Sequence, residues 1–419
     1  MKVFKFGGAS VRDAKAVQNV ASILRLYANE NLCVVISAMG KTTNALEEVI
    51  QACWDKVAYQ FDTKTQEIKE YHNAIISDLG LSEDLELQHK IASVFGIMNH
   101  HFQTPAPDNY DFLYDQIVGL GEVISTLIVD AYLRKEGMDS QWLDARKLIR
   151  TDNRFRDAEI DWKKTELLLK IATEQARSIY IIQGFIGHTP EMLTTTLGRE
   201  GSDFTAAILA YCLDAEQVAI WKDVPGMLNA DPKQFENTVK LDRISFNEAL
   251  ELAYYGASVI HPKTIKPLQN KGIDLHVKSF NDPSLAGTVI QSSMSNDALV
   301  PSYIMKDDQM LVSFKTRDFS FIIEAHLGDI FNRLSKLGVK ISIMQNTALS
   351  FSIVVDSKRV SIQRILEEFG EEYEVRYNSG LELLTIRHYT DELIHSLVGQ
   401  KEILMQQYSR STARLILKP

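Results

Sequence analysis

Short apolar runs alternate with amphipathic segments up to about residue 295. Residues 2–6 form a strand-like run, and 11–30 has the apolar spacing of an amphipathic helix. Residues 32–39 are continuously apolar and rich in β-branched side chains, which is typical of a strand buried on both faces. Similar runs return at 178–187 and 217–226. This alternation predicts an α/β fold, an αβα sandwich with a mainly parallel sheet.

The pattern changes after residues 291–302, a small and polar stretch that contains a proline and reads as a linker. Residues 303–378 show the order β-α-β-β-α-β, which predicts a ferredoxin-like module. Residues 379–419 add strand, helix and strand, about half of a second such module. The expected domains are therefore 1–295, 303–378 and a partial unit at 379–419.

Composition narrows the class of protein. The 419 residues are 45% hydrophobic and 24% charged, which is ordinary for a globular protein. A net charge of −10 argues against a nucleic-acid surface, but not against a small anion in a local basic pocket. The three cysteines lack metal-ligand spacing, which suits reduced thiols in the cytoplasm. No signal peptide or membrane span is expected, and no residues are assigned to a metal site.

The first polar cluster follows the first predicted strand. Lys5 stands at the strand end, Gly7 and Gly8 follow, and a helix is expected to begin at about Ser10. Glycines allow close approach of a ligand to the backbone, and a helix start directs N–H groups toward an anion. The alternative is a plain βα turn with a solvated lysine, and the loop alone does not decide between them.

A second glycine loop, TLGREGSDFTAA (196–207), offers Arg199, Gly201, Ser202 as a helix N-cap and Asp203. An arginine can bind a carboxylate through two parallel hydrogen bonds. The alternative is a well-capped surface helix, which Ser202 and Asp203 alone would satisfy.

Three further segments complete the candidate site. WKDVPGMLNADPK (221–233) leaves a buried strand through two turns, and SAMGKTTNAL (37–46) leaves another strand with several hydroxyl groups. Ligands of open α/β sheets bind beyond the carboxyl ends of strands, where these loops are expected to lie. Glu122 projects from a predicted helix and, taken alone, is more typical of a solvated glutamate than of a site residue.

Taken together, these segments resemble the aspartokinases, a branch of the amino acid kinases, almost end to end. KFGGAS resembles the family's K-F-G-G-T-S, VVISAMGKTTNAL its V-V-x-S-A…T-N loop, and GLGEVIST its G-E-x-x-S helix start. TLGREGSDFTAA resembles T-L-G-R-G-G-S-D-Y-T-A, IWKDVPGMLNADPK resembles I-W-T-D-V-P-G-x-x-x-x-D-P-R, and LAYYGASVIHPKT resembles a helix ending in G-A-K-V-L-H-P. The tail resembles ACT regulatory domains. Six motifs in the right order make the resemblance specific.

The resemblance implies ATP-dependent phosphorylation of the β-carboxylate of L-aspartate, the first step toward lysine, threonine and methionine. It implies ATP and Mg²⁺ as cofactors, an amino-acid effector at the ACT region, and a homodimer or dimer of dimers. It also implies the roles of the site residues. The catalytic group is Lys5, Asp203 and Lys222. The nucleotide contacts Lys5, Gly7, Gly8, Ser10, Lys222, Asp223, Leu228, Lys233, Ser258 and Val259. Aspartate contacts Ser37, Thr43, Glu122, Arg199, Gly201 and Ser202.

This chain departs from the family pattern at several positions. Ala9 replaces a threonine and Glu200 a glycine, while Lys222 stands at a threonine position. Ser258 stands where a lysine often reaches the phosphates, so Lys222 or Lys263 is expected to supply the missing charge. Ser342 occupies a tail position that often carries an acidic residue, which leaves the identity of the effector open.

Two other functions stay open at this stage. One is a kinase for another amino-acid carboxylate, and the other is a non-catalytic amino-acid sensor. The combination of Arg199, Glu122 and the ACT-like tail favours aspartate over other acids, and a decayed site would not need Lys5, Arg199 and Asp203 together.

Overall fold

The computed structural model describes residues 1–105, 107–175, 177–256, 260–318 and 320–419. The chain divides into two compact units. The N-terminal unit comprises Met1–Met227, Lys240–Tyr254 and Ser258–Asp297. The C-terminal unit comprises Leu228–Val239, Tyr255–Ala257 and Ala298–Pro419. Two short segments from the predicted first domain therefore cluster with the C-terminal unit.

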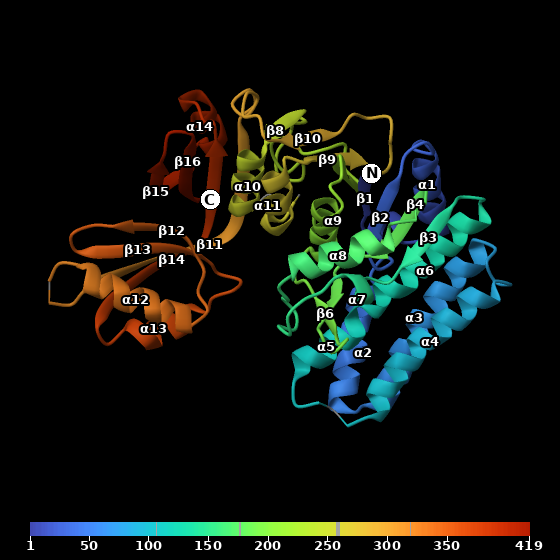
Figure 1. Cartoon of the computed structure of the whole chain (residues 1–419). Coiled ribbons are helices and arrows are strands. Elements are labelled where there is room, and N and C mark those ends of the chain that lie inside the picture. The colour runs from blue at the N-terminus through green and yellow to red at the C-terminus, as the bar shows by residue number, and fades with distance from the viewer. Residues whose placement is uncertain (106, 176, 257–259, 319) are drawn as a thin grey trace. The chain divides into compact units, whose positions relative to one another are not determined.

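The N-terminal unit is built on an eight-stranded sheet in the order β3-β4-β2-β1-β7-β9-β10-β8 (Figure 1). The six strands from β3 to β9 are parallel, whereas β10 runs antiparallel to β9. The bounds are β1 Lys2–Phe6, β2 Leu32–Ile36, β3 Ser140–Leu143, β4 Ile179–Gln183, β7 Gln217–Lys222, β8 Arg243–Ser245, β9 Asp274–Ser279 and β10 Thr288–Gln291. The predicted mainly parallel sheet is confirmed.

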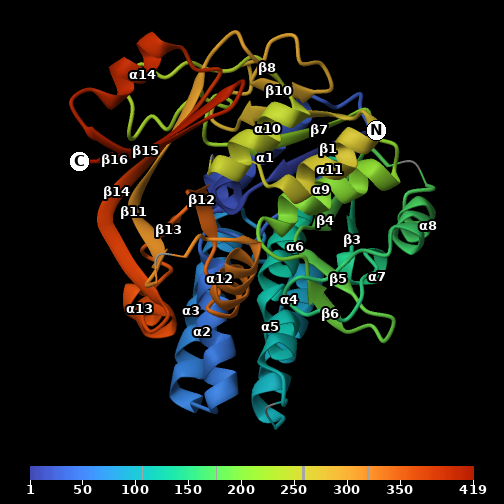
Figure 2. The same ribbon diagram turned by 90° about the vertical axis from the view of Figure 1, so that its left-hand side faces the viewer.

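Helices cover both faces of this sheet (Figures 1 and 2). Helix α6 packs on β2, β3 and β4, whereas α9 packs on β1, β2 and β7. The bounds are α1 Ala14–Arg25, α2 Thr42–Asp55, α3 Ala58–Asp78, α4 Leu85–Gln103, α5 Tyr110–Val118, α6 Leu120–Lys135, α7 Ala145–Leu148, α8 Trp162–Ala172, α9 Gly201–Cys212, α10 Phe246–Tyr255 and α11 Pro262–Lys271. All five residues of β2 are buried, as its unbroken apolar sequence predicts.

One stretch of this unit is long and strongly apolar. The stretch Tyr110–Lys135 is, by length and composition alone, apolar enough to cross a membrane. Its most apolar window is 94% buried inside the fold, as is usual for the core helix of a globular protein.

The predicted strand 178–187 is divided in two. It forms β4 and then β5 (Ile186–His188), which pairs with β6 (Thr194–Thr196) in a separate antiparallel hairpin. Gly184 lies at the break, where a Cβ atom would come within 2.4 Å of the Ser202 side chain. Only glycine therefore lets this loop pass so close to α9.

The C-terminal unit contains a six-stranded antiparallel sheet in the order β12-β13-β11-β14-β16-β15. The bounds are β11 Ser302–Thr316, α12 Glu324–Lys336, β12 Ile341–Asn346, β13 Ser350–Asp356, α13 Ile362–Phe369, β14 Tyr373–Arg387, α14 Asp391–Val398, β15 Glu402–Tyr408 and β16 Thr412–Lys418. The order β11-α12-β12-β13-α13-β14 is the predicted β-α-β-β-α-β module.

The second tail unit is larger than its sequence suggests. The predicted boundary at 378/379 falls inside β14, whose second half pairs with the first half of β11, Ser302–Lys306. With α14 and β16 these strands enclose a separate apolar cluster that includes Leu384, Ile394 and Leu415. The missing strand is the first half of β11, at the start of the first module, so inspection of residues 379–419 alone could not find it.

Candidate active site

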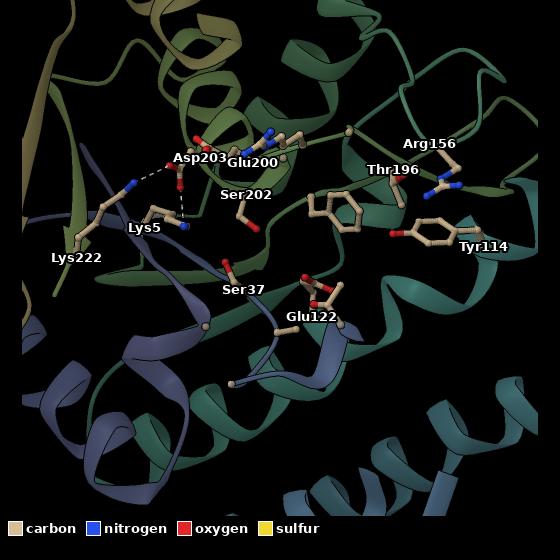
Figure 3. Close-up of a pocket in the computed structure, with 18 residues that line it drawn as sticks. Lys5, Ser37, Tyr114, Glu122, Arg156, Thr196, Glu200, Ser202, Asp203 and Lys222 are labelled. Atoms are coloured by element: carbon tan, nitrogen blue, oxygen red, sulfur yellow. Dashed lines mark ion pairs between the residues drawn. The ribbon is translucent and has the colours of Figure 1, made fainter. Parts of the chain in front are cut away.

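A cavity of about 540 Å³ lies at the carboxyl edge of the parallel sheet in the N-terminal unit (Figure 3). Lys5 comes from β1, Ser37 follows β2, Phe185 follows β4, and Lys222 ends β7. The two glycine loops, represented by Gly8 and by Gly198 to Gly201, both reach it. The sheet edge thus brings together loops that lie nearly 200 residues apart in sequence.

One end of the cavity holds two lysines around one buried carboxylate. Lys5 Nζ lies 2.5 Å from Asp203 Oδ1, and Lys222 Nζ lies 3.7 Å from Asp203 Oδ2 (Figure 3). Burial acts to raise the pKa of Asp203, but Lys5 and Lys222 together hold that pKa below its usual value. Asp203 therefore stays ionised and fixes two ammonium groups, an arrangement suited to a ligand with several negative charges.

The middle of the cavity carries a buried acid. Glu122 is 3% exposed and lies in the first turn of α6. Burial raises its pKa to about 8, although backbone hydrogen bonds from Glu122 and Ala38 and the charge of Lys5 act in the opposite direction. Within the described chain its Oε2 has no hydrogen-bond partner. The site therefore contains an acceptor that a ligand cation would satisfy.

The opposite end contains groups that the sequence did not point to. Figure 3 shows Arg156, Tyr114 and Thr196 together at the end of the cavity away from Lys5 and Lys222. The Arg156 guanidinium lies over the Tyr114 ring, 4.1 Å from its centroid. Burial and Glu47 raise the pKa of Tyr114 to about 12, so its hydroxyl stays protonated and donates to Glu47 Oε1 at 3.0 Å.

Most of the residues predicted for the site line this one cavity. They are Lys5, Gly8, Ser37, Thr43, Glu122, Arg199, Gly201, Ser202, Asp203 and Lys222. Among the described residues, Gly7, Ser10 and Asp223 are absent from its lining. Leu228 and Lys233 belong to the C-terminal unit, and their nucleotide role stays a prediction. Ser258 and Val259 lie outside the described residues.

Two predicted helix starts are wrong in detail. A 3₁₀ turn spans Gly8–Val11, and α1 begins only at Ala14, capped by Asp13, whose side chain accepts from Ala16 N–H. Ser10 is thus buried in the turn rather than at an α-helix start. Helix α9 begins at Gly201, and its N-cap position is Glu200. Ser202 lies inside the first turn and its side chain faces the cavity (Figure 3).

Gly8 shows why the first loop needs glycine. A Cβ atom there would lie 2.6 Å from the backbone oxygen of Ala38 and 3.1 Å from that of Gly40. Gly40 N–H donates to Gly8 O at 3.0 Å, which ties the loops after β1 and β2 together. Both neighbours are backbone atoms, so a larger residue could be accommodated only by moving one of these loops.

The structure locates both lysines that were considered as replacements for the family lysine missing at position 258. Lys222 lies in the cavity, whereas Lys263 forms an ion pair with Asp157 and lines a different hollow between α8, α9 and α11. Charge supply by Lys222 therefore fits the geometry better than charge supply by Lys263.

The sequence analysis missed several lining residues. Besides Tyr114, Arg156, Phe185 and Thr196, they include Ala38, Gly40 and Gly198, and Glu200 was noted only as a departure from the family. Arg156, Phe185 and Glu200 have positive φ angles of 70°, 74° and 54°. A positive φ at a residue other than glycine leaves no motif in the sequence, so only the backbone conformation distinguishes these three positions.

The fold and much of the sequence are shared with known proteins. The model of the amino acid kinase family matches residues 1–279. Lysine-sensitive aspartokinase 3 of Escherichia coli is 31% identical over 92% of this chain and 86% of its own length. The crystal structure of E. coli aspartokinase III with lysine and aspartate (T-state) has a TM-score of 0.82 and 27% identity, covering 99% of this chain and 95% of that one. The structure of that enzyme with aspartate and ADP (R-state) has a TM-score of 0.79 at 27% identity and covers 100% and 96%.

Proposed function

The chain belongs to the amino acid kinase family and, within it, to the aspartokinases, and we propose that this cavity transfers a phosphoryl group from ATP to the β-carboxylate of L-aspartate. The product is 4-phospho-L-aspartate, which opens the route to lysine, threonine and methionine. The observation that carries the proposal is the shared cavity: a two-lysine end, a buried acid and a guanidinium all face one space.

Aspartate fits the middle of the cavity with its ammonium group at Glu122. Arg199 supplies a guanidinium for the α-carboxylate, and within the described chain this guanidinium has no ion pair of its own. Thr43, Ser37 and Ser202 add hydroxyl groups, and the Gly201 backbone lines the same space. With its two ends held in this way, the substrate directs its β-carboxylate toward Lys5.

The phosphoryl end works by alignment and electrostatics. The acceptor is already an anionic nucleophile, so no general base is needed to activate it. Lys5 and Lys222 offset the charge that spreads over the phosphoryl oxygens in the transition state, and Asp203 holds both lysines in place. Gly7, Gly8, Ser10 and Asp223 are proposed to contact the nucleotide through backbone and hydroxyl groups.

Mg²⁺ enters this proposal with the nucleotide. Within the described chain no group of three or more acidic, imidazole or thiol side chains could cage a metal ion. Asp203 is the carboxylate at the phosphoryl end, and it faces two lysines. These residues fit an ion that phosphate oxygens hold, with Asp203 nearby, and such an ion would neutralise phosphate charge.

One assay tests the function. Purified protein is supplied with ATP, Mg²⁺ and L-aspartate, and the acyl phosphate is trapped as the hydroxamate with hydroxylamine. We expect aspartate-dependent hydroxamate and ADP in equal amounts. Glutamate as acceptor is expected to give a much lower kcat/KM. Hydroxamate formation with glutamate but not with aspartate would contradict the proposal.

The C-terminal unit is proposed to mediate regulation and assembly. Several large apolar side chains on and around α12 and β12 are exposed: Phe321, Ile323, Phe331, Met344 and Leu349. Such a surface suits pairing of two copies into a homodimer or dimer of dimers, which light scattering of the full chain would test. An amino-acid effector is proposed here because the similar E. coli enzyme binds lysine. Its identity is tested by adding lysine, threonine or methionine to the assay.

A cytoplasmic location is proposed as well. Cys33, Cys53 and Cys212 are all free and buried, which suits a reducing compartment.

A further inference from the structure

Arg156 is the second guanidinium group in the cavity, and neither the motifs nor the comparisons assign it a role. It lines the same space as Arg199 and Glu122 but comes from the loop after α7. Figure 3 places it at the end away from Lys5 and Lys222, with Glu122 between the two ends.

Helix α5 holds Arg156 through three residues. The Tyr114 ring lies under the guanidinium, and Asp111 Oδ1 accepts from Arg156 Nη1 at 3.3 Å. Asp115 Oδ2 accepts from the Arg156 backbone N–H at 3.0 Å. The same buried carboxylate accepts from the backbone N–H and hydroxyl of Thr196, both at 2.8 Å. One helix thus fixes both Arg156 and the adjacent cavity wall.

These contacts leave part of the guanidinium available. An arginine has five N–H donors that lie in the plane of the group, and a stacked ring occupies only its face. The side-chain hydrogen bond to Asp111 uses Nη1. The remaining edge can therefore donate to a carboxylate without releasing Tyr114 or Asp111.

The backbone of Arg156 also indicates a role beyond packing. Its φ of 70° lies in the left-handed region, which glycine adopts at far lower cost than arginine. Strained conformations of this kind concentrate at functional sites, and two other cavity residues, Phe185 and Glu200, share the feature. A turn that served only to connect α7 to α8 would gain stability from glycine at this position.

We infer that Arg156 binds the carboxylate of the acceptor that is not phosphorylated, acting together with Arg199. The inference rests on the proposed function, because it assumes an amino-dicarboxylic acid lying with its ammonium at Glu122 and its reacting carboxylate at Lys5. Arg156 then selects for acceptors with a free α-carboxylate. Phosphoryl transfer takes place at the opposite end of the cavity, beside Lys5 and Lys222.

The test combines a variant with a modified substrate. In Arg156→Gln the charge is lost, while Arg154→Gln serves as the matched control on the same loop, since Arg154 pairs with Asp152 and Glu159 outside the cavity lining. We expect Arg156→Gln to raise the KM for aspartate about tenfold, the scale of one charge-assisted hydrogen bond, with kcat and the KM for ATP within about twofold of the parent. Arg154→Gln leaves all three constants within about twofold.

The modified substrate is L-aspartic acid 1-amide, whose α-carboxylate is replaced by a neutral amide. The parent and Arg156→Gln are expected to have the same KM for this compound, because the interaction is already missing from the substrate. Equal KM increases for aspartate and the amide, or an unchanged KM for aspartate, would overturn the inference. A variant that merely misfolds would instead lose kcat on both substrates. Arg156→Lys keeps the positive charge, and we expect it to have the kcat of the parent and an affinity for aspartate between those of Arg156→Gln and the parent. Failure of the proposed function would give a different result from failure of this inference, because the parent protein itself would then not phosphorylate aspartate.

Discussion

Binding of aspartate should release a proton from Glu122. In the empty cavity burial raises the pKa of this carboxyl to about 8, so roughly one molecule in eleven is ionised at pH 7. A substrate ammonium group at Glu122 requires the carboxylate. Each binding event at pH 7 should therefore release about 0.9 proton, and ionising the group should cost about 1.4 kcal/mol of binding free energy.

The sign of the pH effect follows from the same argument. Between pH 6 and pH 8 the ionised fraction of Glu122 rises from about 1% to about 50%, so the dissociation constant for aspartate should fall about 50-fold. Isothermal titration calorimetry without nucleotide, in buffers with different ionisation enthalpies, measures both the affinity and the proton count. The amino group of aspartate stays protonated throughout this range.

Glu122→Gln is the control variant. It should bind aspartate weakly and with no pH dependence between pH 6 and pH 8. Proton release near zero for the parent at pH 7, or an unchanged pH dependence in Glu122→Gln, would refute the assignment of the ammonium to Glu122.

The raised pKa of Glu122 also predicts that the ligand-free protein becomes less stable as the pH rises. A carboxyl group whose folded pKa exceeds its ordinary value of 4.5 adds stability below that value, and this contribution is lost as pH rises toward 8. At pH 7 the loss amounts to about 3 kcal/mol. The ligand-free Glu122→Gln protein should therefore melt at a higher temperature than the parent at pH 7, but not at pH 4.5.

Three further substitutions test the other end of the cavity. Lys5→Ala should lower kcat by about 10²–10³-fold and also destabilise the fold by about 3–5 kcal/mol, because Asp203 loses a buried partner; adding Asp203→Ala should restore the melting temperature but not the activity. Lys222→Thr should raise the KM for ATP about tenfold, and unchanged ATP kinetics would remove Lys222 from the phosphoryl end. Gly8→Ala should lower stability by about 1–3 kcal/mol and weaken nucleotide binding, because the new methyl group would meet the Ala38 carbonyl oxygen; an isothermal binding curve identical to that of the parent would argue against the close approach.

Much of the fold could be predicted because its sequence pattern is local. The unbroken apolar run at β2 indicates a strand covered on both faces, and the sheet edge that follows from such strands brings Lys5 and Arg199 into one cavity. Short strands such as β3 and β8 were missed because three or four residues carry too little periodicity.

The part of the site that escaped prediction depends on tertiary contacts. Arg156 reaches the cavity because Asp115, 41 residues earlier, holds its backbone, and no spacing rule connects the two. Glu200 could be noted only as an unusual residue in a glycine loop, since its left-handed backbone is visible only in the structure. Ser202 was predicted as the N-cap, two positions after the actual N-cap Glu200, which is within the usual uncertainty of helix ends.

The two 15-residue strands β11 and β14 affect how the C-terminal unit can be divided. Each strand passes through both halves of the six-stranded sheet, so neither half contains all of its own backbone partners. A protein cut after residue 378 would leave the amide and carbonyl groups of Ser302–Lys306 without their partners on β14. Domain dissection of this tail should therefore keep 302–419 intact, and the whole tail should unfold in one cooperative step.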